Sequence, residues 1–492
     1  MPIYRRPEAA VPAGDAIPFA ARGEFHLFHL SSPPATTHFP ERVRTTWRHT
    51  RSKDMVTWES LPPALAPGEG DEPDADGVWT GSLIEAGGVL HLFYTGHKLG
   101  AANPQTICHA TSRDGVVFAK DRANPILAPD TSIFEPIDWR DPYVLWNEAE
   151  QRYWMIIAAR LNHGPKWRRG CIALATSTDL IHWSLEREPL YSPLTTFCPE
   201  CPELFRLGNH WYLVFSRFSE RVSTVYRIAD TPRGPWRTPM REAFDGRRWY
   251  ASKSLPKDDS TRTFFGWIHD RAGDTDDGAW LWGGDFAAPR DVTADRTGAL
   301  HLRLPADVID AYSIDAPLAG IADSTRKGAS AGGALQLRAE GGTAWRFIDT
   351  ELQDYLFSFR LSDFAGASNF GLLFRADDDL GGYVVEFDRK HSTVALVHWP
   401  QPLDTFWAAL VGRQGELREA DGPRLVEHPF DSSSAREIDC HLLVSGSNVE
   451  LYVADQVALS YRIYGRSKHE LGFFVEDGGV KVDRIKLRTA AA

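Results

Sequence analysis

Short runs rich in aromatic and β-branched residues recur through the first three hundred positions of this chain. Five of them read FHLFHL at 25–30, VLHLFYTG at 89–96, RYWMIIAAR at 152–160, HWYLVFSRF at 210–218 and TRTFFGWIHD at 261–270. Their first residues lie 64, 63, 58 and 51 positions apart. Runs of this kind are typical of buried β-strands, and no apolar stripe with a helical period accompanies them. The pattern predicts a repeat built of strands.

A turn unit accompanies the strands. Residues 52–58, 112–118 and 177–183 share the spacing S-x-D-x-x-x-aromatic. The Ser and Asp side chains of such a unit bond to nearby backbone N–H groups and fix a turn. We therefore interpret the Asp of each unit as structural, and we expect its aromatic residue to pack between neighbouring repeats.

The repeat period, together with a change in the pattern of apolar and polar residues near residue 310, predicts the architecture. Strands that repeat every fifty to sixty residues indicate a β-propeller, because a single four-stranded blade buries its apolar faces only against neighbours in a ring. After the Ala- and Gly-rich stretch 319–342, apolar and polar residues alternate with period 2, which is typical of an antiparallel sandwich. We predict an all-β chain: a five-bladed β-propeller catalytic domain over 1–305, a linker over 306–318 and a β-sandwich over 319–492.

Composition limits the possible partners. The chain has 54 Lys and Arg against 66 Asp and Glu, a net charge of −12, and no basic stripe for nucleic acid or an anionic membrane. The N-terminal segment lacks the apolar stretch of a secretory signal, so a cytoplasmic location is expected. The five cysteines are too sparse for a disulfide framework, and Cys198 and Cys201 are interpreted as buried thiols. We expect no metal or cofactor.

Three carboxylic acids fall at similar offsets before the apolar runs. Asp15 lies 10 residues before the run at 25, Asp141 lies 11 before the run at 152, and Glu200 lies 10 before the run at 210. Because the innermost strand of every blade lines the central channel of a propeller, we expect these carboxyls at one equivalent level of a common funnel. The alternative for each acid is that it caps a turn or pairs with an arginine, as Asp141 could with Arg140.

Three convergent carboxyls suit the hydrolysis of a glycoside. One can act as nucleophile, one as general acid with a raised pKa, and one can stabilise positive charge on the sugar. The 17 Trp residues supply faces for sugar rings, and Trp79, Trp139 and Trp249 stand beside the expected inner strands.

Several motifs resemble glycoside hydrolase family 32, the invertase, inulinase and levanase group of β-fructofuranosidases. They are Arg140-Asp141-Pro142, ECPELF at 200–205, WTGS at 79–82, SKDMVTWESLPPAL at 52–65 and FYTG at 93–96. The resemblance covers most of the chain and implies a five-bladed propeller followed by a β-sandwich, as the repeat also predicts. It further implies cleavage of terminal β-fructofuranosyl groups with retention of configuration.

The resemblance assigns roles by position. Asp15 would be the nucleophile, Glu200 the acid and base, and Asp141, with Arg140 beside it, the stabiliser of the transition state. Retention implies that the Asp15 and Glu200 carboxyls lie about 5 to 5.5 Å apart. Further substrate contacts are expected from Trp79, Ser82, His49 and Tyr250.

The first blade departs from the family pattern. The usual Asn-Asp-Pro-Asn-Gly is replaced by Gly14-Asp15-Ala16-Ile17, and a Gln-Tyr-Asn-Pro segment is replaced by residues 29–33, HLSSP. The sugar contacts from this blade are therefore changed. Three alternatives stay open: a fructosyltransferase, a hydrolase of another furanoside such as a difructose anhydride or an arabinofuranoside, and a non-catalytic sugar-binding propeller. The partner is a small molecule or oligosaccharide containing a furanose; the sequence leaves its linkage, exo or endo action, and the oligomeric state open.

Overall fold

The computed structural model describes residues 3–323, 334–350, 352–376, 381–401, 405–410, 422, 424–465 and 470–491. Within these ranges the chain is almost entirely β, and the α-helices α1 (Ala306–Ala311) and α2 (Thr405–Leu410) have six residues each. Short 3-10 turns lie at Glu41–Val43, Ala272–Asp274 and Ser432–Ser434. No helix in the described ranges has the length and apolar character needed to cross a membrane. The prediction of an all-β chain is confirmed.

Two compact units make up the chain. The first comprises Ile3–Asp270 and Leu281–Leu300, and the second comprises Arg271–Trp280 and His301–Ala492. The boundary near residue 300 lies close to the predicted end of the first domain at 305. The expected linker 306–318 contains α1 and the strand β21 (Ile314–Asp315), which pairs with the last strand of the second unit through Ile314 and Thr489. This stretch is therefore part of the second unit.

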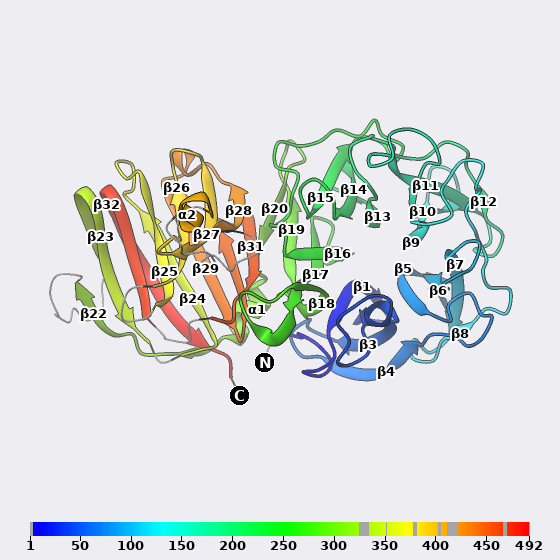
Figure 1. Ribbon diagram of the computed structural model, residues 1–492, viewed down its shortest axis with the longest axis horizontal. Helices are drawn as coiled ribbons and strands as arrows, with labels where there is room; N and C mark the ends of the chain where they lie inside the picture. Colours follow the sequence, from blue (N-terminus) through cyan, green and yellow to red (C-terminus); the bar gives the residue numbers. More distant parts are fainter. Residues whose placement is uncertain are drawn as a thin grey trace. The chain divides into compact units, whose positions relative to one another are not determined.

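The first unit consists of consecutive antiparallel strand series, shown from blue to green in Figure 1. The series are β1 (Ala13–Ala21), β2 (Glu24–Ser31), β3 (Thr46–Ser52) and β4 (Glu59–Leu65); β5 (Gly77–Ala86), β6 (Val89–His97), β7 (Gln105–Ser112) and β8 (Ala119–Lys120); β9 (Arg140–Asn147), β10 (Arg152–Arg160), β11 (Gly170–Ser177) and β12 (Ser184–Leu185); β13 (Glu200–Leu207), β14 (His210–Arg217) and β15 (Ser223–Ala229); and β16 (Trp249–Pro256), β17 (Thr261–Arg271), β18 (Trp280–Phe286), β19 (Arg290–Ala294) and β20 (Leu300–Arg303).

The first strand of each series, β1, β5, β9, β13 or β16, lies nearest to a common centre (Figure 1). The last series joins the first in one nine-stranded sheet, because β18 pairs with β1 through Gly284 and Ala13. The aromatic runs predicted as strands are the second strands of the series, and their middle residues are buried. The second strand of each series is therefore its apolar centre.

The predicted turn units are confirmed. Asp54 Oδ1 accepts hydrogen bonds from the backbone N–H groups of Val56 and Thr57 at 2.8 and 2.7 Å. The Asp residues of the other two units bond in the same way. The aromatic residue of each unit contacts a ring of a neighbouring series: Trp58 contacts Phe265, Phe118 contacts Phe28 and Trp183 contacts Phe93, with centroids 6.1, 5.6 and 5.5 Å apart.

The second unit is one long path of antiparallel strands. Its strands are β21, β22 (Ala319–Asp323), β23 (Leu335–Asp349), β24 (Tyr355–Ser362), β25 (Asn369–Ala376), β26 (Gly382–Asp388), β27 (Thr393–Trp399), β28 (Arg424–Pro429), β29 (Glu437–Ser445), β30 (Asn448–Val453), β31 (Val457–Arg462) and β32 (Glu470–Thr489). The beginning of β32 pairs with β25 and its end pairs with β24, so this strand joins two groups of strands.

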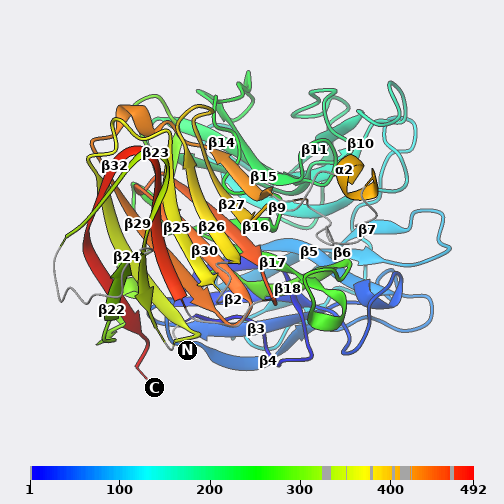
Figure 2. The same cartoon turned by 60° about the vertical axis from the view of Figure 1, so that its left-hand side comes forward.

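Residues from both groups form one apolar core. Phe357 and Phe359 of β24 share this core with Leu372 of β25, Leu396 of β27 and Leu451 of β30. Figure 2 shows β23, β32, β25, β26 and β27 side by side in one layer. The predicted alternation of apolar and polar residues is thus present, with one face of each layer buried.

Candidate active site

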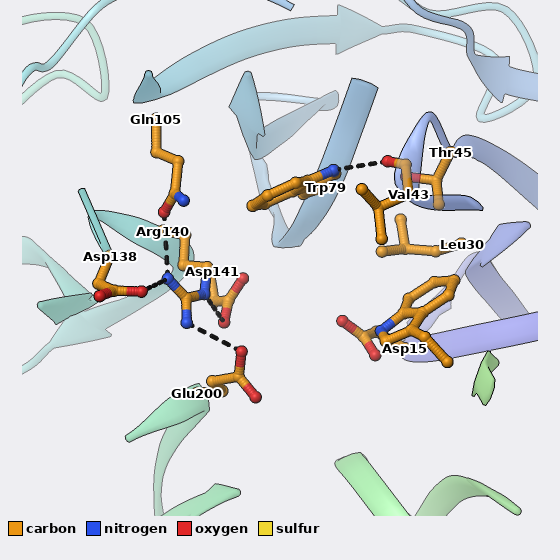
Figure 3. A pocket seen from close by; sticks show the side chains of 11 residues that line it. Asp15, Leu30, Val43, Thr45, Trp79, Gln105, Asp138, Arg140, Asp141 and Glu200 are labelled. Carbon is orange, nitrogen blue, oxygen red and sulfur yellow. Dashed lines mark hydrogen bonds and ion pairs between the residues drawn. The ribbon is translucent and has the colours of Figure 1, made fainter. Parts of the chain in front are cut away.

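A cavity of about 250 Å³ opens at the centre of the first unit, and Figure 3 shows it from close by. Its described lining residues are Asp15, Leu30, Val43, Thr45, Trp79, Gln105, Asp138, Arg140, Asp141, Glu200 and Trp282. Asp15 faces the group formed by Arg140, Asp141 and Glu200 across the cavity (Figure 3). The structure therefore brings the three carboxyls predicted from the sequence together in one site.

A β-bulge in each innermost strand places these side chains. The innermost strands are β1, β5, β9, β13 and β16. The pairing of each with the following strand shifts by one residue near the beginning of the innermost strand. A bulge bends a strand and redirects the side chains within it. The five series thus present their bulges toward the same cavity.

The register corrects the expectation that the carboxyls occupy one equivalent level. Glu200 pairs with Ser216 immediately before its bulge, as Arg140 pairs with Ala158 and Tyr250 with Trp267. Asp141 is therefore one position, and Asp15 two positions, beyond the place equivalent to Glu200. Counting residues back from the apolar runs missed this difference for two reasons. The hairpin between the first two strands is longer in one series, where Asn147 pairs with Arg152, than in another, where Leu207 pairs with His210. The run at 25 also begins one pair further into its strand.

The bulge also strains the backbone at Asp141. Asp141 has φ +59°, and its equivalents Cys201 and Ala251 have φ +50° and +49°. Residues other than glycine seldom adopt this left-handed conformation, and such strain concentrates at functional sites. The Asp141 N–H donates to Thr95 Oγ1 at 2.8 Å, and its Oδ2 accepts from the Cys201 N–H at 2.8 Å, so both ends of the residue are fixed.

Asp15 is held by three donors. Its Oδ1 accepts a hydrogen bond from Trp267 Nε1 at 3.0 Å, and its Oδ2 accepts from Thr80 Oγ1 at 2.5 Å and from the Cys201 thiol at 3.6 Å. Burial and the charge of Asp141 raise the pKa of Asp15 to about 6, although the Thr80 and Trp267 bonds oppose this rise. At neutral pH the carboxylate form prevails, with a fixed orientation.

Glu200 has a different environment. Its Oε1 accepts from Arg140 Nη2 at 2.9 Å, and its Oε2 accepts from the Tyr250 hydroxyl. Burial raises the pKa of Glu200 to about 7, and the Asp141 charge adds to this rise, whereas Arg140 and Tyr250 lower it. Glu200 thus keeps its proton to a higher pH than Asp15 does, which is the separation expected of an acid and a nucleophile.

Arg140 lies between several polar residues of the cavity wall. Its Nη1 donates to Asp138 Oδ1 at 2.5 Å and to Gln105 Oε1 at 3.1 Å, and its Nε lies 3.8 Å from Asp141 Oδ2. Arg140 is buried, so these bonds fix the guanidinium in the wall of the cavity.

A buried lysine lies close to the carboxyls. Lys253, from the bulge of β16, donates from Nζ to the Gly81 carbonyl at 2.7 Å and is 2% exposed. Burial lowers the pKa of Lys253, whereas the carboxylates of Asp141, Glu203 and Asp15 favour its charged form. Its charge in turn lowers the pKa of Asp15.

The predicted substrate contacts divide into three groups. Trp79 and Arg140 line the cavity, and Trp79 is held by a bond from Nε1 to the Val43 carbonyl at 2.8 Å. Tyr250 reaches the site through Glu200. Ser82 and His49 are buried away from the described lining: Ser82 accepts from the Val144 N–H, and the ring of His49 stacks on Phe28 at 4.0 Å and bonds to His26 at 2.9 Å.

Other lining residues carried no signal in the sequence. Gln105, Asp138 and Trp282 come from segments outside the motifs, and Leu30 and Val43 give the first series an apolar wall where its motif departs from the family pattern. Trp139 and Trp249, expected beside the funnel, are fully buried instead. The thiols of Cys198 and Cys201 are buried, as interpreted from the sequence.

Known proteins resemble this chain in sequence. The chain is 34% identical over 264 residues to a sucrose-6-phosphate hydrolase of Escherichia coli. This alignment covers 50% of this chain and 52% of that enzyme. It is 27% identical over 484 residues to a raffinose invertase of Escherichia coli, covering 93% of this chain and 88% of that one. The first of these alignments thus spans about half the length of the relative.

Solved structures resemble the whole chain. An exo-inulinase from Aspergillus awamori matches with a TM-score of 0.74 and 17% identity, over 99% of this chain and 98% of that one. The fructan 1-exohydrolase IIa of Cichorium intybus matches with a TM-score of 0.70 and 18% identity, over 99% and 97%. These likenesses show the fold, a β-propeller followed by a β-sandwich.

The resemblance drawn from the motifs is confirmed by a family model. The model described as the N-terminal domain of glycosyl hydrolases family 32 matches residues 16–303. This match begins one residue after Asp15 and includes Asp141, Glu200 and the bulged strands that carry them. Since it spans more than half of the 492 residues, the chain belongs to glycoside hydrolase family 32.

Proposed function

We propose that this chain is a retaining β-fructofuranosidase that releases terminal fructosyl groups from unphosphorylated fructosides, and that its five strand series are the five blades of a propeller. The observation that carries the proposal is the pairing of Asp15 and Glu200 across one cavity with pKa values of about 6 and 7. Similar carboxyls with different environments are the mark of a nucleophile and an acid.

The reaction would proceed in two displacements. In the first, Asp15 attacks the anomeric carbon while Glu200 gives its proton to the departing oxygen, so that an ester to Asp15 forms and an alcohol leaves. In the second, Glu200 takes a proton from water, whose oxygen attacks the same carbon and restores the Asp15 carboxylate. Asp141, fixed by the Thr95 and Cys201 bonds, would accept bonds from the sugar hydroxyls and stabilise positive charge.

The charges of the cavity support an unphosphorylated substrate. Among its described lining residues Arg140 is the single cation, and its donors already bond to Asp138, Gln105 and Glu200. Four carboxylic acids share the lining with it. A phosphate group there would meet negative charge without a matching donor. The small volume favours one terminal sugar unit at a time, since drug-sized ligands need about 300 Å³ or more.

A substrate panel tests this proposal. Purified protein is incubated with sucrose, raffinose, inulin and sucrose 6-phosphate, with and without added acceptor sugar, and released fructose is measured. We expect fructose from the first three at a kcat/KM at least tenfold above that for sucrose 6-phosphate. Equal or faster cleavage of the phosphorylated sugar would overturn the substrate assignment, and dominant transfer to the acceptor would assign a fructosyltransferase.

The stereochemistry of the product tests the mechanism. We expect NMR spectra taken early in the reaction to show β-fructofuranose, and mass spectrometry of a trapped intermediate to place the sugar on the peptide that contains Asp15. An α anomer as first product would exclude the two-step route.

A further inference from the structure

The residue before Asp15 has no side chain, and the indole of Trp282 takes the space where one would lie. A Cβ atom built on Gly14 would lie 2.7 Å from Cζ2 and 3.0 Å from Cζ3 of Trp282, closer than a Cβ atom approaches a neighbour in proteins. We propose that Gly14 and Arg42 are positioning residues, which hold Trp282 beside the nucleophile as an apolar contact for the terminal sugar. The identity of that sugar rests on the proposed function.

Space, and not backbone conformation, requires glycine at position 14. Gly14 does not have the left-handed φ that favours glycine, whereas Gly283 has φ +77°. The pairing of Ala13 with Gly284 brings β18 beside β1, so Trp282, two residues before Gly284, meets Gly14. The family pattern has Asn at this position. The chain therefore has an aromatic ring where an amide side chain would otherwise begin.

Trp282 is one neighbour away from the nucleophile. Its ring centroid lies 5.6 Å from that of Trp267, and Trp267 Nε1 donates to Asp15 Oδ1 at 3.0 Å. Trp282 is partly buried and lines the cavity. A displacement of the Trp282 ring would thus change the cavity wall while the three donors that hold Asp15 stay in place.

Arg42 holds the backbone of Trp282. Its Nε donates to the Trp282 carbonyl at 2.6 Å, its Nη1 donates to the Thr36 carbonyl at 2.5 Å, and its Nη2 lies 3.5 Å from Asp270 Oδ2. Arg42 is 6% exposed, so these partners replace water around its charge. A lysine has a single nitrogen on a flexible stem and cannot reproduce this fork of contacts.

The cavity wall beside Trp282 presents mainly carbon atoms to a ligand. Leu30 and Val43 lie side by side in this wall (Figure 3). The donors near them bond to backbone carbonyls, because Thr45 Oγ1 donates at 2.7 Å and Trp79 Nε1 at 2.8 Å to such groups. On this side a sugar unit therefore gains packing contacts with the ring, in place of a hydrogen bond to an amide.

A double-mutant cycle tests the inference. Gly14→Ala and Arg42→Lys are each made in wild type and in Trp282→Ala, and kcat and KM are measured on sucrose. Gly366→Ala is the matched control, since Gly366 also lacks a left-handed φ and the nearest atom to a Cβ there is 3.8 Å away.

We expect Gly14→Ala and Arg42→Lys to raise KM at least fivefold with kcat within threefold, because the displaced ring contacts substrate and transition state alike. In Trp282→Ala, either substitution should change KM less than twofold, and Gly366→Ala should leave it unchanged. Equal rises in KM with and without the indole would overturn the inference. If Gly14→Ala folds only together with Trp282→Ala, the conflict for space is supported; if it folds in neither, Arg42→Lys decides.

A second measurement needs no substrate. In protein labelled with 4-fluorotryptophan, the ¹⁹F resonance of Trp282 is identified by its loss in Trp282→Phe. This resonance should move in Gly14→Ala and Arg42→Lys and stay in place in Gly366→Ala. A resonance that moves in neither variant overturns the inference. If wild type cleaves no fructoside but the resonance moves, the proposed function fails and the placement of Trp282 stands.

Discussion

The Tyr250 hydroxyl donates a hydrogen bond to Glu200 Oε2. Both residues stand immediately before the bulge of their strands, β16 and β13, so the bond joins equivalent positions of consecutive series. It strengthens as Glu200 gives up its proton, because the donor then faces a full negative charge. Tyr250 is therefore placed to assist the first step of the proposed reaction.

Tyr250→Phe should lower kcat about tenfold, since a hydrogen bond to a charged group contributes about 1.5 kcal/mol or more. Because the Tyr250 bond lowers the pKa of Glu200, its loss should move the basic limb of the kcat/KM profile to higher pH. A pH profile on sucrose measures both effects. A loss of rate with both limbs unmoved would mean that Tyr250 acts only through packing.

Asp15→Asn should abolish turnover and stabilise the fold. We expect a fall in kcat of about 10⁴-fold or more, because a neutral amide cannot form the ester intermediate. The raised pKa of Asp15, about 6 against 3.8, means that the folded state disfavours its charge. Stability is then lost as pH rises from about 4 to 6, and the variant should regain up to about 3 kcal/mol at pH 7.

Thermal unfolding at several pH values checks this result. The Tm of Asp15→Asn should exceed that of wild type at pH 7, and the difference should vanish near pH 4, where both side chains are neutral. Asp71→Asn, at a fully exposed position outside the cavity, serves as the control and should leave turnover unchanged. A less stable Asp15→Asn protein at neutral pH would contradict the assigned charge state.

Lys253→Met should shift the acidic limb of the kcat/KM profile. The ammonium of Lys253 lowers the pKa of Asp15, so its removal should move this limb to higher pH and reduce activity near neutrality. Lys253→Gln keeps a donor for the Gly81 carbonyl without the charge and should show the same shift. In Lys257→Met, which removes a lysine bonded to Asp291, the profile should not move. An unshifted limb in both Lys253 variants would exclude this electrostatic role.

Acid should destabilise the first unit through its buried histidines. Burial lowers the pKa of His49 to about 3 and that of His29 to about 4, both below the ordinary value of 6.5. At a pH between the ordinary pKa and the lowered pKa of the folded state, the unfolded chain binds more protons than the folded chain. The free energy of unfolding therefore falls as pH drops from about 6.5 towards 4. His49→Phe, which keeps the stacking on Phe28, should reduce this dependence, and the Tm difference from wild type should change with pH. A constant difference would show that His49 does not titrate on unfolding.

Much of the architecture could be predicted from the sequence because buried strands have apolar residues that recur at regular intervals along the chain. The run at 152–160 contains Trp154 and Ile156, both fully buried, and its apolar character reports that position directly. The unit at 52–58 could be interpreted because Asp54 bonds to N–H groups two and three residues away. Local causes of this kind remain visible in the order of residues.

The site could be predicted only in part, because its geometry depends on pairing between distant segments. Asp15, Asp141 and Glu200 could be found by their place in the sequence. Their different positions in the bulges follow from the register of strand pairing, which a residue count does not reveal. Gln105 reaches the cavity through its bond to Arg140, 35 positions away. His49 is a predicted substrate contact, whereas its ring stacks on Phe28 in the interior of the first series.

The repeated bulge separates the chemistry of this scaffold from its folding. In β16 the strained position equivalent to Asp141 holds Ala251, and in β13 it holds Cys201, so three unlike side chains occupy the same backbone conformation. In these three strands the conformation does not depend on the identity of the residue. A carboxylate, a thiol and a methyl group are thus all compatible with one backbone conformation, so the residue at this position can change in evolution while the strand that carries it keeps its shape.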